Sequence, residues 1–171
     1  MSSSRGRPPS QHGDPHGWND LYHYLIIHQA QLDRLGSYFV ERDELAISWI
    51  DERTLKIAGR IHCRFGIFLD VLKYLEVNDR RQVRTVRYRY HAGFEGQQPR
   101  PIFRYDNAYA HRGHPDAHHK HHVDYATWTE ISPPEWIGHD RWPTLAQVLD
   151  ELYDWWHQTG RVLDLPDIST E

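Results

Sequence analysis

The segment Thr54-Leu-Lys-Ile-Ala-Gly-Arg-Ile-His-Cys-Arg64 alternates between apolar and polar residues. Leucine, isoleucine and cysteine occupy one set of alternate positions, and lysine, arginine and histidine occupy the other. Because successive side chains of a β-strand point to opposite faces of a sheet, this pattern predicts a strand with one buried face. The segment therefore indicates a fold built on a half-buried sheet.

Three further strands are predicted after this one. Residues 66–77 are apolar on both sides, which suits a central strand, and a turn at 79–81 follows. Residues 82–91 alternate again, and residues 102–107 do so after a long hairpin loop that begins at Gly93. The alternation over 82–91 assigns side chains to two faces: Val86, Tyr88 and Tyr90 to one, and Arg87, Arg89 and His91 to the other.

Helices are predicted before and after these strands. Residues 19–35 carry leucines at near-helical spacing, and Gly36 follows. Thr144-x-x-Gln147 has the form of a capping box, and an apolar stripe follows it as far as Trp156. Weaker patterns predict two short strands or a hairpin over 38–50, a short strand over 123–131 and a proline-containing connection over 132–141. Together these elements predict an α+β fold, in which an antiparallel sheet of four to six strands packs with the C-terminal helix and an additional N-terminal helix.

The length of 171 residues suits one domain. We expect a disordered tail over 1–17, a single α+β domain over 18–160 and an acidic tail over 161–171, because residues 2–17 contain no aliphatic side chain. Cys63 is the only cysteine and leaves no partner for an internal disulfide. No apolar run has the length of a signal sequence or a membrane span, so we expect a cytoplasmic protein that does not enter a membrane.

The charges divide along the chain more strongly than the net charge of -4 indicates. Residues 53–104 carry twelve Lys and Arg residues against four acidic residues, whereas residues 123–171 carry ten acidic residues against two arginines. A positive face made of arginine suits phosphates or nucleic acid. A solvated sheet face with ordinary ion pairs explains the same pattern.

The stretch from Arg104 to His122 holds the chemistry, because six of the fourteen histidines lie between His111 and His122. Histidine titrates near neutral pH and can move protons or, when charged, hold a phosphate. With nearby arginines these groups match metal-free RNA cleavage, which uses a base, an acid and cations and needs no metal or cofactor. The predicted catalytic residues are Arg104, Asp106, His119, Lys120 and His121. The predicted substrate-binding residues are Arg87, Arg89, His91, Tyr105 and Asn107.

Three alternatives remain open at this point. A zinc hydrolase is one, because His-x-His on a strand puts two imidazoles on one side, although Lys120 lies among the would-be ligands. A nucleic-acid-binding module without catalysis is another. In a third, structural interpretation, Asp106 and Asn107 close a loop by hydrogen bonds and the histidines are merely solvated.

The order Arg104-Tyr-Asp-Asn107 followed by His119-Lys-His121, after several strands and before a short helix, resembles the TumE-type toxins of bacterial and archaeal toxin–antitoxin systems. The likeness spans about residues 53–156. It implies a cytoplasmic growth inhibitor that is neutralised by a cognate antitoxin, usually one with a helix-turn-helix. It also implies functional roles for Arg104, Asp106, Asn107, His119, Lys120 and His121. The segment before residue 37 and the stretch 130–141 depart from the family pattern. We therefore expect a toxin that acts on RNA, with its oligomeric state open.

Overall fold

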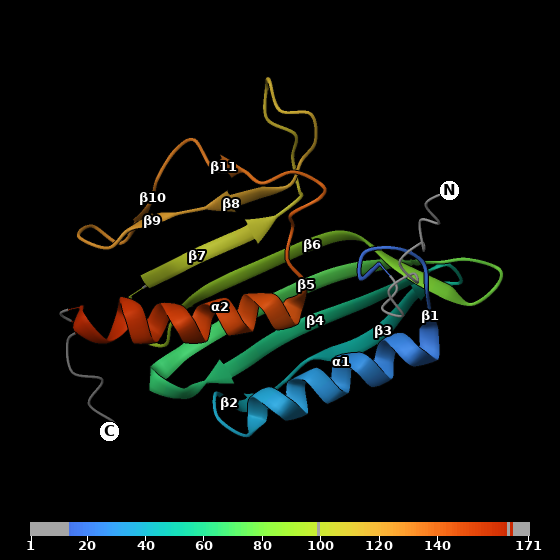
Figure 1. The fold of residues 1–171 in the computed structure, drawn as a ribbon, viewed down its shortest axis with the longest axis horizontal. Coiled ribbons are helices and arrows are strands. Elements are labelled where there is room, and N and C mark those ends of the chain that lie inside the picture. The colour runs from blue at the N-terminus through green and yellow to red at the C-terminus, as the bar shows by residue number, and fades with distance from the viewer. Residues whose placement is uncertain (1–13, 99, 164, 166–171) are drawn as a thin grey trace, which may run out of the picture.

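The computed structural model describes residues 14–98, 100–163 and 165. The predicted tails lie largely outside these residues. Two α-helices, α1 (Leu21–Gly36) and α2 (Leu145–Gln158), lie across one face of a nine-stranded sheet (Figure 1). The strands of this sheet are β1 (Asn19–Asp20), β2 (Val40–Asp43), β3 (Ala46–Asp51), β4 (Thr54–Cys63), β5 (Ile67–Val77), β6 (Gln82–Phe94), β7 (Arg100–Asp106), β8 (His119–His121) and β11 (Glu135–Trp136).

All pairings are antiparallel, in the order β11-β8-β7-β6-β5-β4-β2, with β3 also paired to β4 and β1 to β6. Short 3-10 helices occupy Arg64–Gly66 and Gly160–Val162. The α+β class, the antiparallel sheet and both helices are confirmed, but four to six strands was too few. β2 and β3 lie within the two short strands or hairpin predicted over 38–50. β1, β8 and β11 span only two or three residues each and are too brief to show an alternating pattern.

The long strands match the sequence pattern because one face of the sheet is buried under the helices. The buried side chains of β4 and β5 on this helix-covered face are Leu55, Ile57, Ile61, Cys63, Ile67, Leu69, Val71 and Leu75. Leu149 and Leu152 of α2 are fully buried in the same core, together with Leu35 of α1. The capping box at the start of α2 is confirmed. Within the described residues no helix covers the other face, called here the open face.

A bulge in β6 changes which side chains face the core. Thr85 pairs with Leu75 and Arg87 pairs with Tyr74, so Val86 has no directly opposite residue on β5. Its side chain is exposed, and the prediction that it shares a face with Tyr88 and Tyr90 was wrong. Beyond the bulge the alternation is as expected, with Tyr88 and Tyr90 buried.

The connections differ from prediction in three places. The hairpin loop expected from Gly93 is shorter, because β6 continues to Phe94 and β7 begins at Arg100. A side chain at residue 93 would meet the Phe68 ring at 2.7 Å, so glycine is required for strand continuation there. The single strand expected over 123–131 is instead a hairpin of β9 (Val123–Asp124) and β10 (Thr129–Glu130). Residues 119–121, which lie in none of the predicted strands, form β8.

Candidate active site on the open face

Two cross-strand rows of polar side chains occupy the open face where β6, β7 and β8 pair. In the first row His91 lies opposite Arg104, which lies opposite His121. Directly paired residues of neighbouring strands point to the same face. The second row consists of Arg89, Asp106 and His119. We call these six residues the polar rows.

The centre of the polar rows is an imidazole held between two carboxylates. Asp106 Oδ2 lies 3.3 Å from His121 Nε2, and Glu130 Oε2 lies 3.3 Å from His121 Nδ1. Arg104 is paired with the same two acids, at 3.1 Å from its Nε to Asp106 Oδ2 and 3.3 Å from its Nη2 to Glu130 Oε2. The guanidinium also lies directly against the ring, with 3.1 Å between Arg104 Nη2 and His121 Nδ1, and the contact of Arg104 Nε is an ion pair without hydrogen-bond geometry.

Asp106 is ionised at neutral pH in this setting. Burial alone raises the pKa of its carboxyl group, but the contacts with His121, the Ala108 N–H and Arg104 together lower the pKa below its usual value. The Ala108 N–H donates to Asp106 Oδ1 at 3.2 Å, which leaves Oδ2 for Arg104 and His121. The carboxylate therefore orients its two neighbours, Arg104 and His121, rather than exchanging protons itself.

His91 lies on the other side of Arg104 from His121. The pKa of His91 lies below its usual value, because burial lowers it more than the nearby Asp70 carboxylate raises it. The charge of Arg104 lowers it further. The ring is therefore neutral at pH 7 and able to accept a proton. A hollow of about 350 Å³ lies beside His91 and Glu130, and Arg60 and Arg100 contribute to its walls.

Two arginines of β6 extend the polar rows as cations. Arg87 and Arg89 are exposed, and within the described part of the chain neither makes an ion pair. By contrast, Arg60 on the same face is paired with Asp70 at 2.7 Å. Arg87 and Arg89 are thus free to bind an anionic ligand.

His119 belongs to a histidine cluster at the edge of the polar rows. Its Nδ1 donates to the Ala117 carbonyl oxygen at 2.7 Å, so its Nε2 accepts from His114 Nδ1 at 2.7 Å. The ring of His111 packs against it, with 4.3 Å between ring centroids. The pKa of His119 lies below its usual value. Burial lowers it most, the hydrogen bond to Ala117 raises it, and the neighbouring His111 and His114 lower it further. His119 is fully buried, unlike His121, so its ring is not accessible to a ligand.

Three predicted site residues do not face the polar rows. Lys120 and Tyr105 point to the helix-covered face, where both bind Glu151 of α2, at 2.6 Å from Lys120 Nζ and 2.7 Å from Tyr105 Oη. The Asn107 side chain accepts from the Tyr88 N–H at 2.8 Å and donates to the Val86 carbonyl oxygen at 3.0 Å. Asn107 therefore closes the strand edge at the bulge, as the structural interpretation expected for this residue.

Glu130 is the site residue that the sequence did not reveal. It lies in β10, and the hairpin of β9 and β10 returns it to His121. Local sequence contains no signal for this return, because the single strand predicted over 123–131 hides the turn. Among the described residues, no group of three or more His, Cys, Asp or Glu side chains could hold a metal ion. Nor is any described helix long and apolar enough to cross a membrane.

Comparison with known proteins identifies the family. No curated protein and no solved structure significantly matches the chain. A family model described as toxin TumE matches residues 28–158, a longer range than the expected 53–156. The match spans the stretch 130–141 and begins within α1, so it includes the second half of this helix. With more than half of its length matched, the chain belongs to the TumE toxin family of toxin–antitoxin systems and has a cognate antitoxin as its partner.

Proposed function

We propose that this toxin cleaves RNA at the polar rows by metal-independent acid–base chemistry. The observation that supports the proposal is the row in which two imidazoles, His91 and His121, flank the guanidinium of Arg104. Neighbouring strands lie about 4.8 Å apart, so the backbones of the two histidines are separated by roughly 10 Å. A phosphate bound over Arg104 then has one imidazole on each side.

The proposed reaction is an internal transesterification. His91, neutral at pH 7, takes the proton of the ribose 2′-hydroxyl while the 2′-oxygen forms a bond to phosphorus. The bond from phosphorus to the 5′-oxygen breaks, and protonated His121 gives its proton to that oxygen. The products are a 2′,3′-cyclic phosphate and a free 5′-hydroxyl. Arg104 stabilises the negative charge that develops on the phosphoryl oxygens.

Binding of the RNA backbone is assigned to Arg87 and Arg89. Their exposed guanidinium groups, which make no ion pair with any described residue, follow β6 away from His91, along a line that phosphates of a single strand can occupy. The cytoplasm is the proposed place of action. The antitoxin is proposed to be a small helix-turn-helix protein, because the family resemblance implies one.

Three histidine variants test this proposal in the full-length protein. His91→Ala and His121→Ala should each lower the rate of RNA cleavage by about a hundredfold or more and relieve growth arrest, with an unchanged melting temperature. His122→Ala is the matched control, because His122 is the next residue but is half exposed and pairs with Glu135 at 2.6 Å. It should cleave and arrest growth as the parent does.

Three outcomes contradict the proposal. Folded His91→Ala and His121→Ala proteins that cleave at the parent rate exclude these roles. Loss of cleavage on addition of a chelator, with recovery on zinc, favours the zinc hydrolase instead. RNA that is bound by the parent but recovered uncut favours the binding module, for which changes at Arg87 and Arg89 should matter more than changes at histidine.

A further inference from the structure

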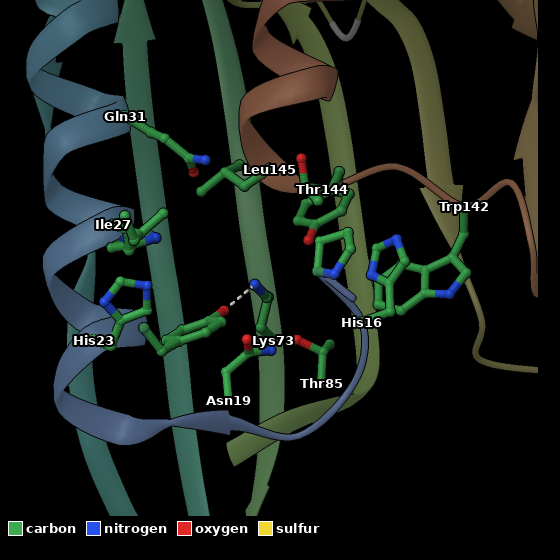
Figure 2. A pocket seen from close by; sticks show the side chains of 14 residues that line it. His16, Asn19, His23, Ile27, Gln31, Lys73, Thr85, Trp142, Thr144 and Leu145 are labelled. Atoms are coloured by element: carbon green, nitrogen blue, oxygen red, sulfur yellow. Dashed lines mark hydrogen bonds between the residues drawn. The ribbon is translucent and has the colours of Figure 1, made fainter. Parts of the chain in front are cut away.

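A separate cavity of about 260 Å³ lies on the helix-covered face, between α1, the N-terminus of α2 and the strands β5 and β6 (Figure 2). Lys73 of β5 projects into this cavity and is only 6% exposed. The sheet separates the cavity from the polar rows, so RNA cleavage there gives it no role. The cavity therefore requires its own explanation.

Lys73 interrupts an otherwise apolar row on β5. Its neighbours in that row, Val71 and Leu75, are buried core residues. Within the described residues, no carboxylate pairs with Lys73. Its Nζ donates to the hydroxyl of Tyr24 and lies 5.1 Å from the centroid of that ring. A buried ammonium group without a carboxylate partner is costly, so its retention suggests a use other than stability.

Tyr90 provides a second polar group beside Lys73. Its side chain is fully buried, and its hydroxyl group lies against the Lys73 ammonium group but has no acceptor for its own proton in the described structure. A buried hydroxyl group without an acceptor destabilises the fold unless a ligand supplies one. Lys73 and Tyr90 therefore offer two donors to the same cavity.

The walls of the cavity favour a negative charge. The described lining contains three histidines and no Asp or Glu. Burial first, and the charge of Lys73 second, lower the pKa of His28 to about 4, so this histidine is neutral at pH 7 and the cation facing the cavity is Lys73. Thr144 and Leu145 bring the N-terminus of α2 to the cavity, where the helix dipole attracts anions.

We propose that this cavity binds a small organic anion, with its carboxylate or phosphate group against Lys73 and Tyr90 and its apolar part against Ile27 and Leu145. The volume lies just below the range of about 300 to 1,000 Å³ that drug-sized ligands occupy, so a compact molecule fits. Residues before His28, among them Ile27, lie outside the family match and form one wall. The site is accordingly expected in chains that carry a similar N-terminal segment.

The test compares charged and neutral probes of one size. Benzoate, phenyl phosphate and benzyl alcohol are added to the full-length protein at constant ionic strength, and the melting temperature is recorded. Benzoate or phenyl phosphate should raise it in a saturable manner, because a ligand of the native state stabilises that state, whereas benzyl alcohol should not. The stronger of the two anions indicates whether the ligand is a carboxylate or a phosphate.

Variants locate the binding. Lys73→Met should abolish the rise, and Tyr90→Phe should weaken it while keeping the ring. Arg161→Gln is the control, because it removes one positive charge from an exposed residue of the last 3-10 helix and should leave the rise intact. If Lys73→Met does not fold, the rise in melting temperature of Tyr90→Phe with the same anions tests the proposal. The proposal is overturned if no anion exceeds benzyl alcohol, or if the folded variants respond as the parent does.

Discussion

The two faces of β6, β7 and β8 both carry ion pairs, but only the open face also carries exposed arginines outside such pairs within the described residues. On the helix-covered face the paired residues Tyr90, Tyr105 and Lys120 form a row, and Lys120 is bound to Glu151 of α2. On the open face Arg87 and Arg89 have no ion pair within the described residues. Alternate residues of the motif segments 104–107 and 119–121 therefore point to different faces of the sheet. The two sets of residues must be tested separately.

The largest effect is expected from Arg104, at the centre of the open face. Arg104→Ala should lower RNA cleavage by about a hundredfold to a thousandfold. Arg104→Lys should be nearly as damaging, because lysine lacks the planar fork that meets Asp106 and Glu130 together. Melting temperature and cleavage rate are measured on the same samples.

Asp106→Asn is the companion variant for this prediction. It keeps the shape of the side chain but weakens the orientation of Arg104 and His121, so cleavage should fall with little change in melting temperature. If these variants unfold, Arg104 and Asp106 have a structural role instead. A fully active Arg104→Lys protein would contradict the fork argument.

The next effect concerns a histidine on the helix-covered side. The pKa of His28 is about 4 in the folded chain, below the value of about 6.5 in the unfolded chain. The stability from keeping His28 neutral is complete above pH 6.5 and is lost as the pH falls towards 4, because the unfolded chain binds the proton first. The loss attributable to His28 is about 3 kcal/mol.

Urea unfolding at pH 7 and pH 4.5 measures this loss. His28→Leu should remove most of it, whereas the exposed His23→Leu, on the same helix, serves as the control. Equal losses in the parent and in His28→Leu would show that histidines elsewhere carry the acid sensitivity.

The smallest effect separates Lys120 from the histidines on either side of it. Lys120→Met breaks the contact of 2.6 Å with Glu151, which is partly buried, and should lower the free energy of unfolding by about 1.5 to 3 kcal/mol. The folded fraction should still cleave RNA at nearly the parent rate. Lys56→Met removes a half-exposed lysine and is the control. If cleavage is lost while stability is unchanged, Lys120 takes part in the cleavage reaction, as the family motif implies.

Much of the sheet follows from local pattern, and the exceptions have physical causes. The strand over 54–64 was predictable because one buried face imposes a period of two, and the strand over 66–77 because a central strand is apolar on both sides. Val86 was assigned to the wrong face because a bulge adds one residue and shifts that period. No local pattern marks the bulge, which depends on pairing with β5.

The site was predictable in part for a similar reason. Arg104 and Asp106 share a face because they are two residues apart on one strand, and His119 and His121 do so for the same reason. Glu130 could not be predicted, because a hairpin and not a sequence period brings it to His121. Lys73 had a signal that was missed: one lysine at alternate spacing among isoleucine, leucine and valine.

Strand order also governs the timing of folding. From β4 to β8 the neighbours in the sheet are neighbours along the chain, so each pairing closes a comparatively short loop. The contact between Arg34 of α1 and Asp150 of α2 joins residues 116 positions apart. Contacts of such separation form late, because more chain entropy is lost before they stabilise the fold. We expect the sheet to assemble first and the cavity around Lys73, which needs both helices, to be completed last.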